Sequence, residues 1–489
     1  MTRIFAKFVV SAGCILAYAL LIILLPQPRS TSAVVSEDRP CIQAQTAWLP
    51  DTPSPKFDDP PPHPAPDCPF YQSSWQTFLF VTQPDSQGRP RFLEYASIED
   101  LFGPTAAKEF AHGKVANLLN LAPRNIQQPN EKSSPQGRAA LHAGVTQAGP
   151  LRGILIDQNG NPIFYGIHVN DVFANFLKHS GLLTKDALLN ADPEKLEFPK
   201  GSIELKSAWR IVEREEDGRN HFTTEARVPN LRIKNGVLVS SDTSRKVTVA
   251  LMALHVVFIL DGHPEFIWST FEHVGSLGQG IRDNAPALVN PQSPPRSVVS
   301  GSDWPLFKGG MTEDRANVPL SGQDLVNGFD ERSQHFRTSN TIVQTSVYRL
   351  FSASKSAASS PDGLEDGDIL DVNAMMRDLF LADSPGRDDI RRSYQLVGAV
   401  WLDNPSRDFR SNMLFQNADG QSTDADGAMV AGEDRLSSTA MESFTQLDRP
   451  NCFSCHNTKR VTDDVTQKTL VGPKRLNVSH VMSKFLAEQ

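Results

Sequence analysis

The sequence predicts an α+β fold: a large body rich in antiparallel β-strands, with peripheral helices and a short, mainly helical C-terminal segment. β-Prone runs separated by turn residues dominate the middle of the chain, between residues 203 and 271. Helical patterns lie on either side of this region, without the regular strand–helix alternation that is typical of a parallel sheet. The composition, 39% hydrophobic and 21% charged, is that of a globular chain of two or three domains.

The first elements after the N-terminal region are predicted to be helices around a hairpin. Ser74 can cap a helix that ends before Pro84. Residues 154–165 form two short β-prone runs around an Asn-Gly pair, which is typical of a tight hairpin turn. Residues 170–189 have a helical pattern.

The central strands differ in their patterns of hydrophobic residues. Residues 203–211 alternate between apolar and charged side chains, so this strand is predicted to have one face in solvent. The charged residues concerned are Glu204, Lys206 and Arg210. Residues 247–260 are almost continuously apolar, which predicts a strand covered on both faces. Residues 266–271 are its expected partner after a turn at Asp261-Gly262.

The last third of the chain predicts helices and one more strand. A helix is expected over 369–380 and a strand over 394–401. Thr439 and Glu442 have the spacing of a capping box, which predicts a helix over 439–447. Residues 478–486 carry one apolar face at helical spacing.

A Cys-x-x-Cys-His sequence, Cys452 to His456, is the most informative motif of the chain. Two thiols at this spacing can add across the two vinyl groups on one side of a porphyrin. The histidine that follows then lies under the iron and supplies Nε2 as a ligand. Only five cysteines occur in the chain, so this arrangement is improbable by chance.

Three other interpretations of the motif compete with haem attachment. A structural zinc site needs a fourth ligand, and the adjacent Cys455 and His456 are awkward ligands for one tetrahedral ion. A thioredoxin-like motif belongs between a strand and a helix, whereas Arg-Pro-Asn precedes this one at 449–451. The third interpretation is coincidental spacing.

At Cys452, Cys455 and His456 the chain resembles c-type cytochromes with a single covalently bound haem. Residues 254–273 also resemble a stretch found in large exported proteins that end in Cys-x-x-Cys-His. The resemblance implies one haem c, bound covalently by the two cysteines and ligated by His456. Residues 457–489 are too few to cover both faces of a haem, so upstream residues are expected to wall it.

The sixth ligand of the iron is left open by the sequence. The candidates are Met482, His480, an upstream residue such as His255 or His273, or no protein ligand. The expected function is one-electron transfer with a redox partner protein. The alternative is a periplasmic redox enzyme, a haem-coupled oxidoreductase or peroxidase that uses the large body as its substrate domain. The absence of a recognisable catalytic template favours the electron carrier.

The N-terminal residues predict export to the periplasm. Arg3 and Lys7 precede an uncharged apolar run over 8–25, and small residues follow at 31–33. Residues 1–33 are therefore expected to be a signal peptide or a signal anchor. The run just reaches the length of a bilayer span, which favours an anchor in the inner membrane.

Residues 34–70 are rich in proline and contain Cys41 and Cys68. In an oxidising periplasm these cysteines are expected to form a disulfide that stabilises the fold by about 3–4 kcal/mol. The competing interpretation is a flexible linker with two free thiols. The remaining domains are expected to be an α+β body at 71–425 and a cytochrome c-like segment at 426–489 packed on it.

Other features of the sequence carry less information. The net charge of −8 argues against nucleic acid as a partner. His255, His263 and His273 occur close together with Glu265 and Glu272, and ordinary hydrogen bonding in a sheet is favoured over a metal site or a proton-handling pocket. Residues 422–433 have the offsets of a calcium loop but begin with Ser instead of Asp, so a surface turn is favoured.

Overall fold

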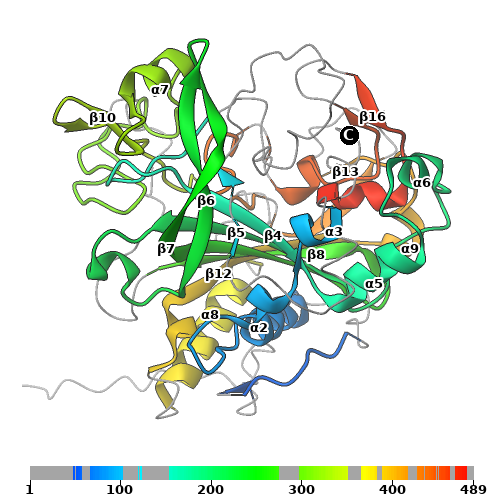
Figure 1. Cartoon of the computed structure of the whole chain (residues 1–489). Helices are drawn as coiled ribbons and strands as arrows, with labels where there is room; N and C mark the ends of the chain where they lie inside the picture. Colours follow the sequence, from blue (N-terminus) through cyan, green and yellow to red (C-terminus); the bar gives the residue numbers. More distant parts are fainter. Residues whose placement is uncertain are drawn as a thin grey trace, which may run out of the picture. The chain divides into compact units, whose positions relative to one another are not determined.

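An eleven-stranded sheet, almost wholly antiparallel, organises the chain in the computed structural model (Figure 1). The structure describes residues 48–49, 51–57, 67–102, 119–120, 122–123, 153–274, 297–350, 365–382, 388–416, 427–433, 435–447, 449, 451–462 and 468–481. All of them belong to one compact unit, Cys41–Gln489. The predicted export segment, 1–33, lies outside the described residues.

The strands of the sheet confirm the predicted α+β fold. Its main path runs, in spatial order, through β1 (Ala96–Ser97), β4 (Phe164–Val169), β5 (Ile203–Ile211), β7 (Val237–Leu260), β8 (His263–His273), β12 (Tyr394–Leu402), β14 (Ala428–Gly432) and β13 (Phe415–Gln416). Three further strands join it: β2 (Leu119–Asn120) pairs with β6 (Thr223–Lys234), which pairs with β7, and β3 (Ala122–Pro123) pairs with β4. Only β2–β6 and β13–β14 are parallel.

Several further elements are short. Among them are the helices α3 (Ile98–Phe102), α7 (Gly322–Gly328) and α9 (Pro405–Asp408) and the 3-10 turns η3 (Arg91–Glu94), η6 (Glu215–Gly218) and η8 (Ile390–Ser393). A small sheet consists of β9 (Phe329–Asp330), β10 (His335–Thr338) and β11 (Thr341–Ile342). Among the helices that are described, none has both the length and the apolarity to cross a bilayer.

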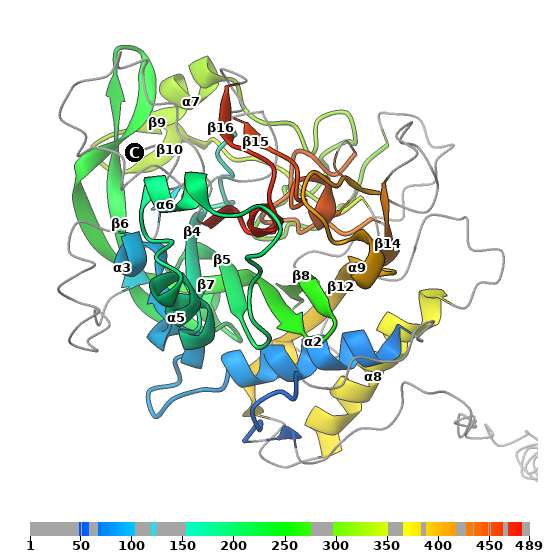
Figure 2. The ribbon, with the colours of Figure 1, turned by 90° about the vertical axis from the view of Figure 1, so that its right-hand side faces the viewer.

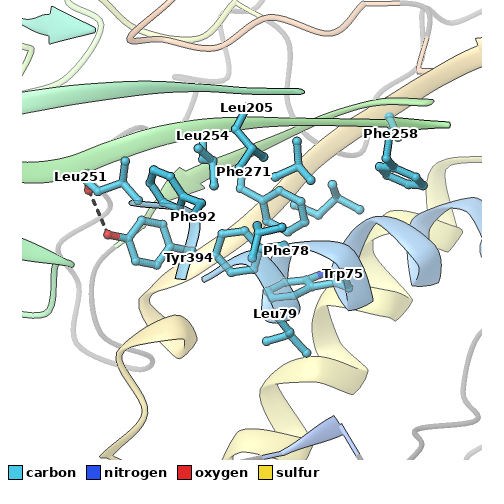
Figure 3. Close-up of a cluster of buried hydrophobic side chains, with 14 of the residues drawn as sticks. Trp75, Phe78, Leu79, Phe92, Leu205, Leu251, Leu254, Phe258, Phe271 and Tyr394 are labelled. Atoms are coloured by element: carbon cyan, nitrogen blue, oxygen red, sulfur yellow. Dashed lines mark hydrogen bonds between the residues drawn. The ribbon is translucent and has the colours of Figure 1, made fainter. Parts of the chain in front are cut away.

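Two helices cover one face of the sheet, α2 (Cys68–Val81) and α8 (Glu365–Ala382) (Figure 2). Figure 3 shows the core between them and the strands, where the rings of Phe78 and Phe271 stack at a centroid distance of 4.1 Å. The hydroxyl of Tyr394 donates to the carbonyl of Leu251 across this core, at 3.0 Å. The predicted helix over 369–380 is confirmed within α8.

α2 begins earlier than predicted. Pro69 occupies its first turn, where a missing N–H costs nothing, and Ser74 lies inside the helix. The Ser74 hydroxyl donates to the Phe70 carbonyl at 2.9 Å and therefore does not cap the helix. Cys68 is buried at the start of α2, and Cys41 lies outside the described residues, so the disulfide stays a prediction.

The hairpin predicted over 154–165 is present as a tight turn with a short bridge before β4. Gly160 at the turn has φ +86°, and a Cβ there would lie 2.7 Å from the carbonyl oxygen of Phe336. The helix predicted over 170–189 is two helices, α5 (Asp171–His179) and α6 (Lys185–Asn190). Asn170 and Thr184 cap them.

All four predicted strands are present, although β7 begins ten residues before the predicted start at 247 and β8 extends beyond 266–271 at both ends. The solvent-exposed face predicted for β5 is wrong. Glu204 and Arg210 are each only 6% exposed. Ser479 of the C-terminal segment donates to the carboxylate of Glu204, and Asp217 forms an ion pair with Arg210 at 2.6 Å. Glu204 is therefore covered by chain that is distant in the sequence, and Arg210 by the turn that follows β5.

The C-terminal segment is not mainly helical over its described residues. It contains the 3-10 turns η9 (Cys452–Ser454) and η10 (Arg475–Val478) and a two-stranded sheet of β15 (Val461–Thr462) and β16 (Thr469–Val471). The predicted helix at 439–447 is a series of turns. The Thr439 amide donates to the buried carboxylate of Glu272 on β8, so partners on the sheet replace helical hydrogen bonds. Of the helix predicted over 478–486, residues 482–486 lie outside the described residues.

Candidate functional site

The Cys-x-x-Cys-His sequence folds into one tight turn. The Asn451 side chain accepts a hydrogen bond from the Phe453 amide at 3.1 Å and begins η9. The amides of Cys455 and His456 both donate to the carbonyl of Cys452, at 3.2 and 3.0 Å. Local backbone bonding therefore holds both thiols and the imidazole on a single turn.

Phe453, between the two cysteines, fixes this turn to the body of the protein. Its side chain is fully buried. Its ring meets Phe415 at 90° with a centroid distance of 5.1 Å, and Trp268 of β8 lies at 6.4 Å. Burial of a phenylalanine side chain contributes about 1.5–3 kcal/mol, which favours one fixed position for the turn.

The two cysteines are in no disulfide and have different surroundings. Burial raises the pKa of Cys452 well above its usual range, and the nearby charge of Glu442 adds to this effect. Cys455 is next to a cation, because Nη1 of Arg449 lies 3.1 Å from its sulfur. A raised pKa is unlike that of an activated thiolate nucleophile, whose pKa is lowered by its surroundings.

The His456 ring is oriented by a backbone carbonyl. Its Nδ1 lies 2.9 Å from the oxygen of Val478, which can only accept a hydrogen bond, so Nδ1 carries the proton. Nε2 then carries the lone pair. Metal-ligating histidines commonly have this arrangement, because the second hydrogen bond fixes both the tautomer and the ring direction.

Two aromatic rings enclose the His456 imidazole. Trp268 lies at a centroid distance of 4.0 Å with an interplanar angle of 36°, and His480 lies at 4.1 Å with an angle of 25°. Two rings this close cannot share one face of an imidazole, so each covers its own face. The ring of the predicted ligand is therefore held firmly between the sheet and the chain after η10.

This placement disfavours His480 as the sixth ligand. A ring stacked on a ligand imidazole lies on the same side of the iron as that ligand. In addition, Nε2 of His480 donates to the carbonyl of Cys455 at 3.1 Å. Met482, the other candidate near the chain end, lies outside the described residues.

The histidines of β7 and β8 have separate hydrogen-bond partners, which confirms the favoured interpretation. His255 bonds to Thr270 and Glu442, His263 bonds to Glu265, and Nε2 of His273 donates to the carbonyl of Asn220. His263 and His273 are at opposite ends of β8, about 33 Å apart at 3.3 Å per residue. Within the described part of the chain, no three His, Cys, Asp or Glu side chains are placed to share a metal ion.

The faces of the sheet separate the two upstream candidates for the sixth ligand. Trp268 and Thr270 alternate with Phe271 and His273 along β8, and Phe271 packs towards α2. His273 therefore points to the helix-covered face, away from His456. His255, bonded to Thr270, is on the same face as the Cys-x-x-Cys-His turn.

A buried polar group lies between this face of the sheet and the turn. His255 and Glu442 are 3.1 Å apart, Nε2 to Oε1. Although burial alone would raise it, the pKa of Glu442 falls to about 2 because His255 and other donors stabilise the carboxylate. Glu204 is different: burial raises its pKa to about 7, and the Ser479 hydroxyl is 2.7 Å away. Two buried carboxyl groups with opposite pKa shifts thus lie under the same segment.

Four contributions to the site could not be found from the motif. Trp268, Glu204 and the Val478 carbonyl come from distant parts of the sequence, and Arg449 precedes the motif with no distinguishing pattern. Of the calcium-like stretch, 422–433, residues 422–426 lie outside the described residues. Its second half is not a surface turn, because it forms strand β14 and Glu433 is buried.

No protein-family model, no curated protein and no solved structure matches this chain. The interpretation of the site therefore depends on the chemistry of its residues.

Proposed function

We propose that the protein is an exported c-type cytochrome that carries one haem and transfers single electrons. Cys452 and Cys455 would each add sulfur and hydrogen across one vinyl group, which forms a thioether without net oxidation. His456 would ligate the iron through Nε2. The observation that carries the proposal is the hydrogen bond from Nδ1 of His456 to the carbonyl of Val478, which orients an imidazole on the same turn as the thiols of Cys452 and Cys455.

The residues around the turn suit an electron carrier. When bound, a haem supplies a one-electron couple whose potential depends on its surroundings. Phe453 and Trp268 exclude water from one side of the turn, and the rings around His456 keep the ligand still. A rigid ligand suits electron transfer, because the surroundings of the iron then rearrange little when its charge changes between the ferric and ferrous states.

A second candidate function, a haem-coupled oxidoreductase or peroxidase, is supported by the buried pair of His255 and Glu442. Glu442 affects the pKa of Cys452, so this acid–base pair lies close to the attachment site. Such a pair can move protons in a haem pocket. EPR separates the candidates: low-spin iron that is unreactive towards peroxide supports the carrier, and high-spin iron that reacts rapidly supports the enzyme.

The export and the partner belong to the same proposal. Residues 1–33 would direct the chain to the periplasm, and residues 8–25 would remain as a membrane anchor if the signal is not cleaved. A net charge of −8 suits a basic redox partner protein through electrostatic attraction. Fractionation of cells, followed by N-terminal sequencing, distinguishes a cleaved signal from an anchor.

The deciding experiment is covalent haem attachment in a bacterium that matures c-type cytochromes. The exported full chain should stay coloured after denaturation, with a pyridine haemochrome spectrum of two thioethers. Cys455→Ala should shift this spectrum to that of one thioether. Ser454→Ala, between the cysteines, is the matched control and should keep the parent spectrum. A colourless, iron-free wild-type protein would overturn the proposal.

A further inference from the structure

Glu204 is a buried carboxyl group on β5 that faces the C-terminal segment. Its cross-strand neighbours are apolar, Val169 on β4 and Val257 on β7. The charged residue that acts on it is Lys206, two positions along the same strand. The Ser479 hydroxyl donates to the Glu204 carboxylate at 2.7 Å. An ionisable group in such a position is costly to bury, so a specific role is worth seeking.

Ser479 is held from three directions. It is fully buried, and its hydroxyl donates to Glu204. The same hydroxyl accepts a bond from the Val481 amide at 3.4 Å, and the Ser479 amide donates to the carbonyl of Leu476 at 3.2 Å. These contacts fix the plane of the peptide bond between Val478 and Ser479.

That peptide plane carries the carbonyl that orients His456. The Val478 oxygen and the Ser479 amide belong to one rigid unit. A shift of the Ser479 backbone amide therefore moves the acceptor of the Nδ1 hydrogen bond, which is 2.9 Å long. A continuous chain of contacts thus runs from β5 to the predicted iron ligand.

We propose that Glu204 is a positioning residue for His456, acting through Ser479 and the Val478 carbonyl, and that it lowers the redox potential of the iron. A well-aligned acceptor at Nδ1 raises the basicity of the imidazole and favours the ferric state. The inference rests on the proposed function, because it assigns a role towards a haem that His456 would ligate.

Four variants of the holoprotein test this role through the midpoint potential. Ser479→Ala and Glu204→Leu remove the donor and the acceptor, and both should raise the potential. A tenfold change in the ferric-to-ferrous equilibrium, about 59 mV for one electron, is the upper end of the expected rise. Glu204→Gln keeps an acceptor oxygen and should stay near the parent value. Ser207→Ala, on the same strand but bonded to Gly166, is the matched control.

A second measurement does not need haem. In ¹⁵N NMR spectra of the full chain produced without haem, His456 should be the Nδ1–H tautomer. Ser479→Ala and Glu204→Leu should shift it towards a mixture of tautomers, whereas Glu204→Gln and Ser207→Ala should not. Should Glu204→Leu fail to fold, Ser479→Ala decides.

The outcomes separate this inference from the proposed function. A wild-type protein that never binds haem would overturn the proposed function, and with it the effect on the potential. The tautomer of His456 would still test the contacts that run from Glu204 through Ser479 and Val478. If Ser479→Ala keeps both the parent potential and the Nδ1–H tautomer, the positioning role is overturned although the cytochrome assignment stands.

Discussion

The imidazole of His255 and the carboxylate of Glu442 meet 3.1 Å apart and join the central sheet to the chain before the Cys-x-x-Cys-His turn. Nδ1 of His255 is bonded to Thr270 of β8, and the second oxygen of Glu442 accepts from the Ser438 amide at 2.9 Å. Each of the two side chains is therefore held in position by a second hydrogen bond, His255 by β8 and Glu442 by the chain before the turn. The pair connects the position of the turn to the sheet.

Loss of the Glu442 charge should destabilise the fold in a pH-dependent way. Its pKa is about 2 in the folded protein against an ordinary value of 4.5, so its stabilisation is complete above pH 4.5 and is lost as the pH falls towards 2. At 1.36 kcal/mol per pKa unit, this amounts to about 3 kcal/mol. Urea unfolding of Glu442→Gln at pH 7 should show this loss, and the difference from wild type should shrink at pH 3.

Glu225→Gln is the matched control for this prediction. Glu225 pairs with Lys246 at 2.6 Å, but its side chain is 62% exposed. Exposed pairs contribute about 0–1 kcal/mol, so this variant should change little at either pH. Equal effects of the two substitutions at pH 7 would show that the buried pair has no special role.

Glu204 should have the opposite pH dependence. Burial raises its pKa to about 7, so the folded state binds a proton that the unfolded state releases from pH 4.5 upwards. Its contribution is complete below pH 4.5 and is lost as the pH rises through 7. Glu204→Gln cannot ionise, so its stability relative to wild type should improve between pH 5 and pH 8, by up to about 3 kcal/mol. A difference that is constant with pH would contradict the raised pKa.

The local geometry of the candidate site follows from the sequence. Cys452, Cys455 and His456 are close in the chain, and Asn451 can begin a turn wherever the rest of the protein lies. The second half of strand β7, residues 247–260, was equally predictable, since a continuous apolar run needs cover on both faces, whereas its more exposed first half was not predicted. Both predictions depend on information within a few residues.

The surroundings of the site could not be predicted in this way. The alternation along β5 places Glu204 on the face opposite the apolar side chains of the strand. The sequence does not show that Ser479 covers this face. Likewise, Thr439 and Glu442 have the spacing of a capping box, yet Glu272 and His255 on the sheet bind them instead. The tertiary hydrogen bonds are favoured here, because leaving a buried carboxylate without donors costs more free energy than a capping interaction of a short helix contributes.

Lys474 should be important for docking of the C-terminal segment. Its buried ammonium group donates to the carbonyls of Leu188 at 2.7 Å and of Leu189 and Ala191 at 3.3 Å, at the end of α6. Lys474→Met leaves these carbonyls without their donor, which should cost about 1–3 kcal/mol in urea unfolding. Lys195→Met is the control, because Lys195 is 81% exposed and pairs with Asp192. A similar loss in both variants would mean that Lys474 acts only through its surface charge.

Trp268 should control how firmly the predicted iron ligand is held. It lies 4.0 Å from His456 and covers the face opposite His480, and its Nε1 donates to the carbonyl of Glu265 at 3.2 Å. Trp268→Leu removes the ring and should destabilise the protein by about 3 kcal/mol, whereas Trp268→Phe keeps a ring over the imidazole. In the holoprotein, freedom of the imidazole to rotate should broaden the EPR signal of Trp268→Leu but not that of Trp268→Phe.

Trp304→Phe separates this effect from a general response to the loss of tryptophan. Trp304 packs on Phe307 in a different cluster, with centroids 4.9 Å apart, and should leave the EPR signal unchanged. An EPR signal of Trp268→Leu identical to wild type, at reduced stability, would show that Trp268 packs the core without restraining His456. In that case the stack with His480 and the Val478 carbonyl would together suffice to fix the ring.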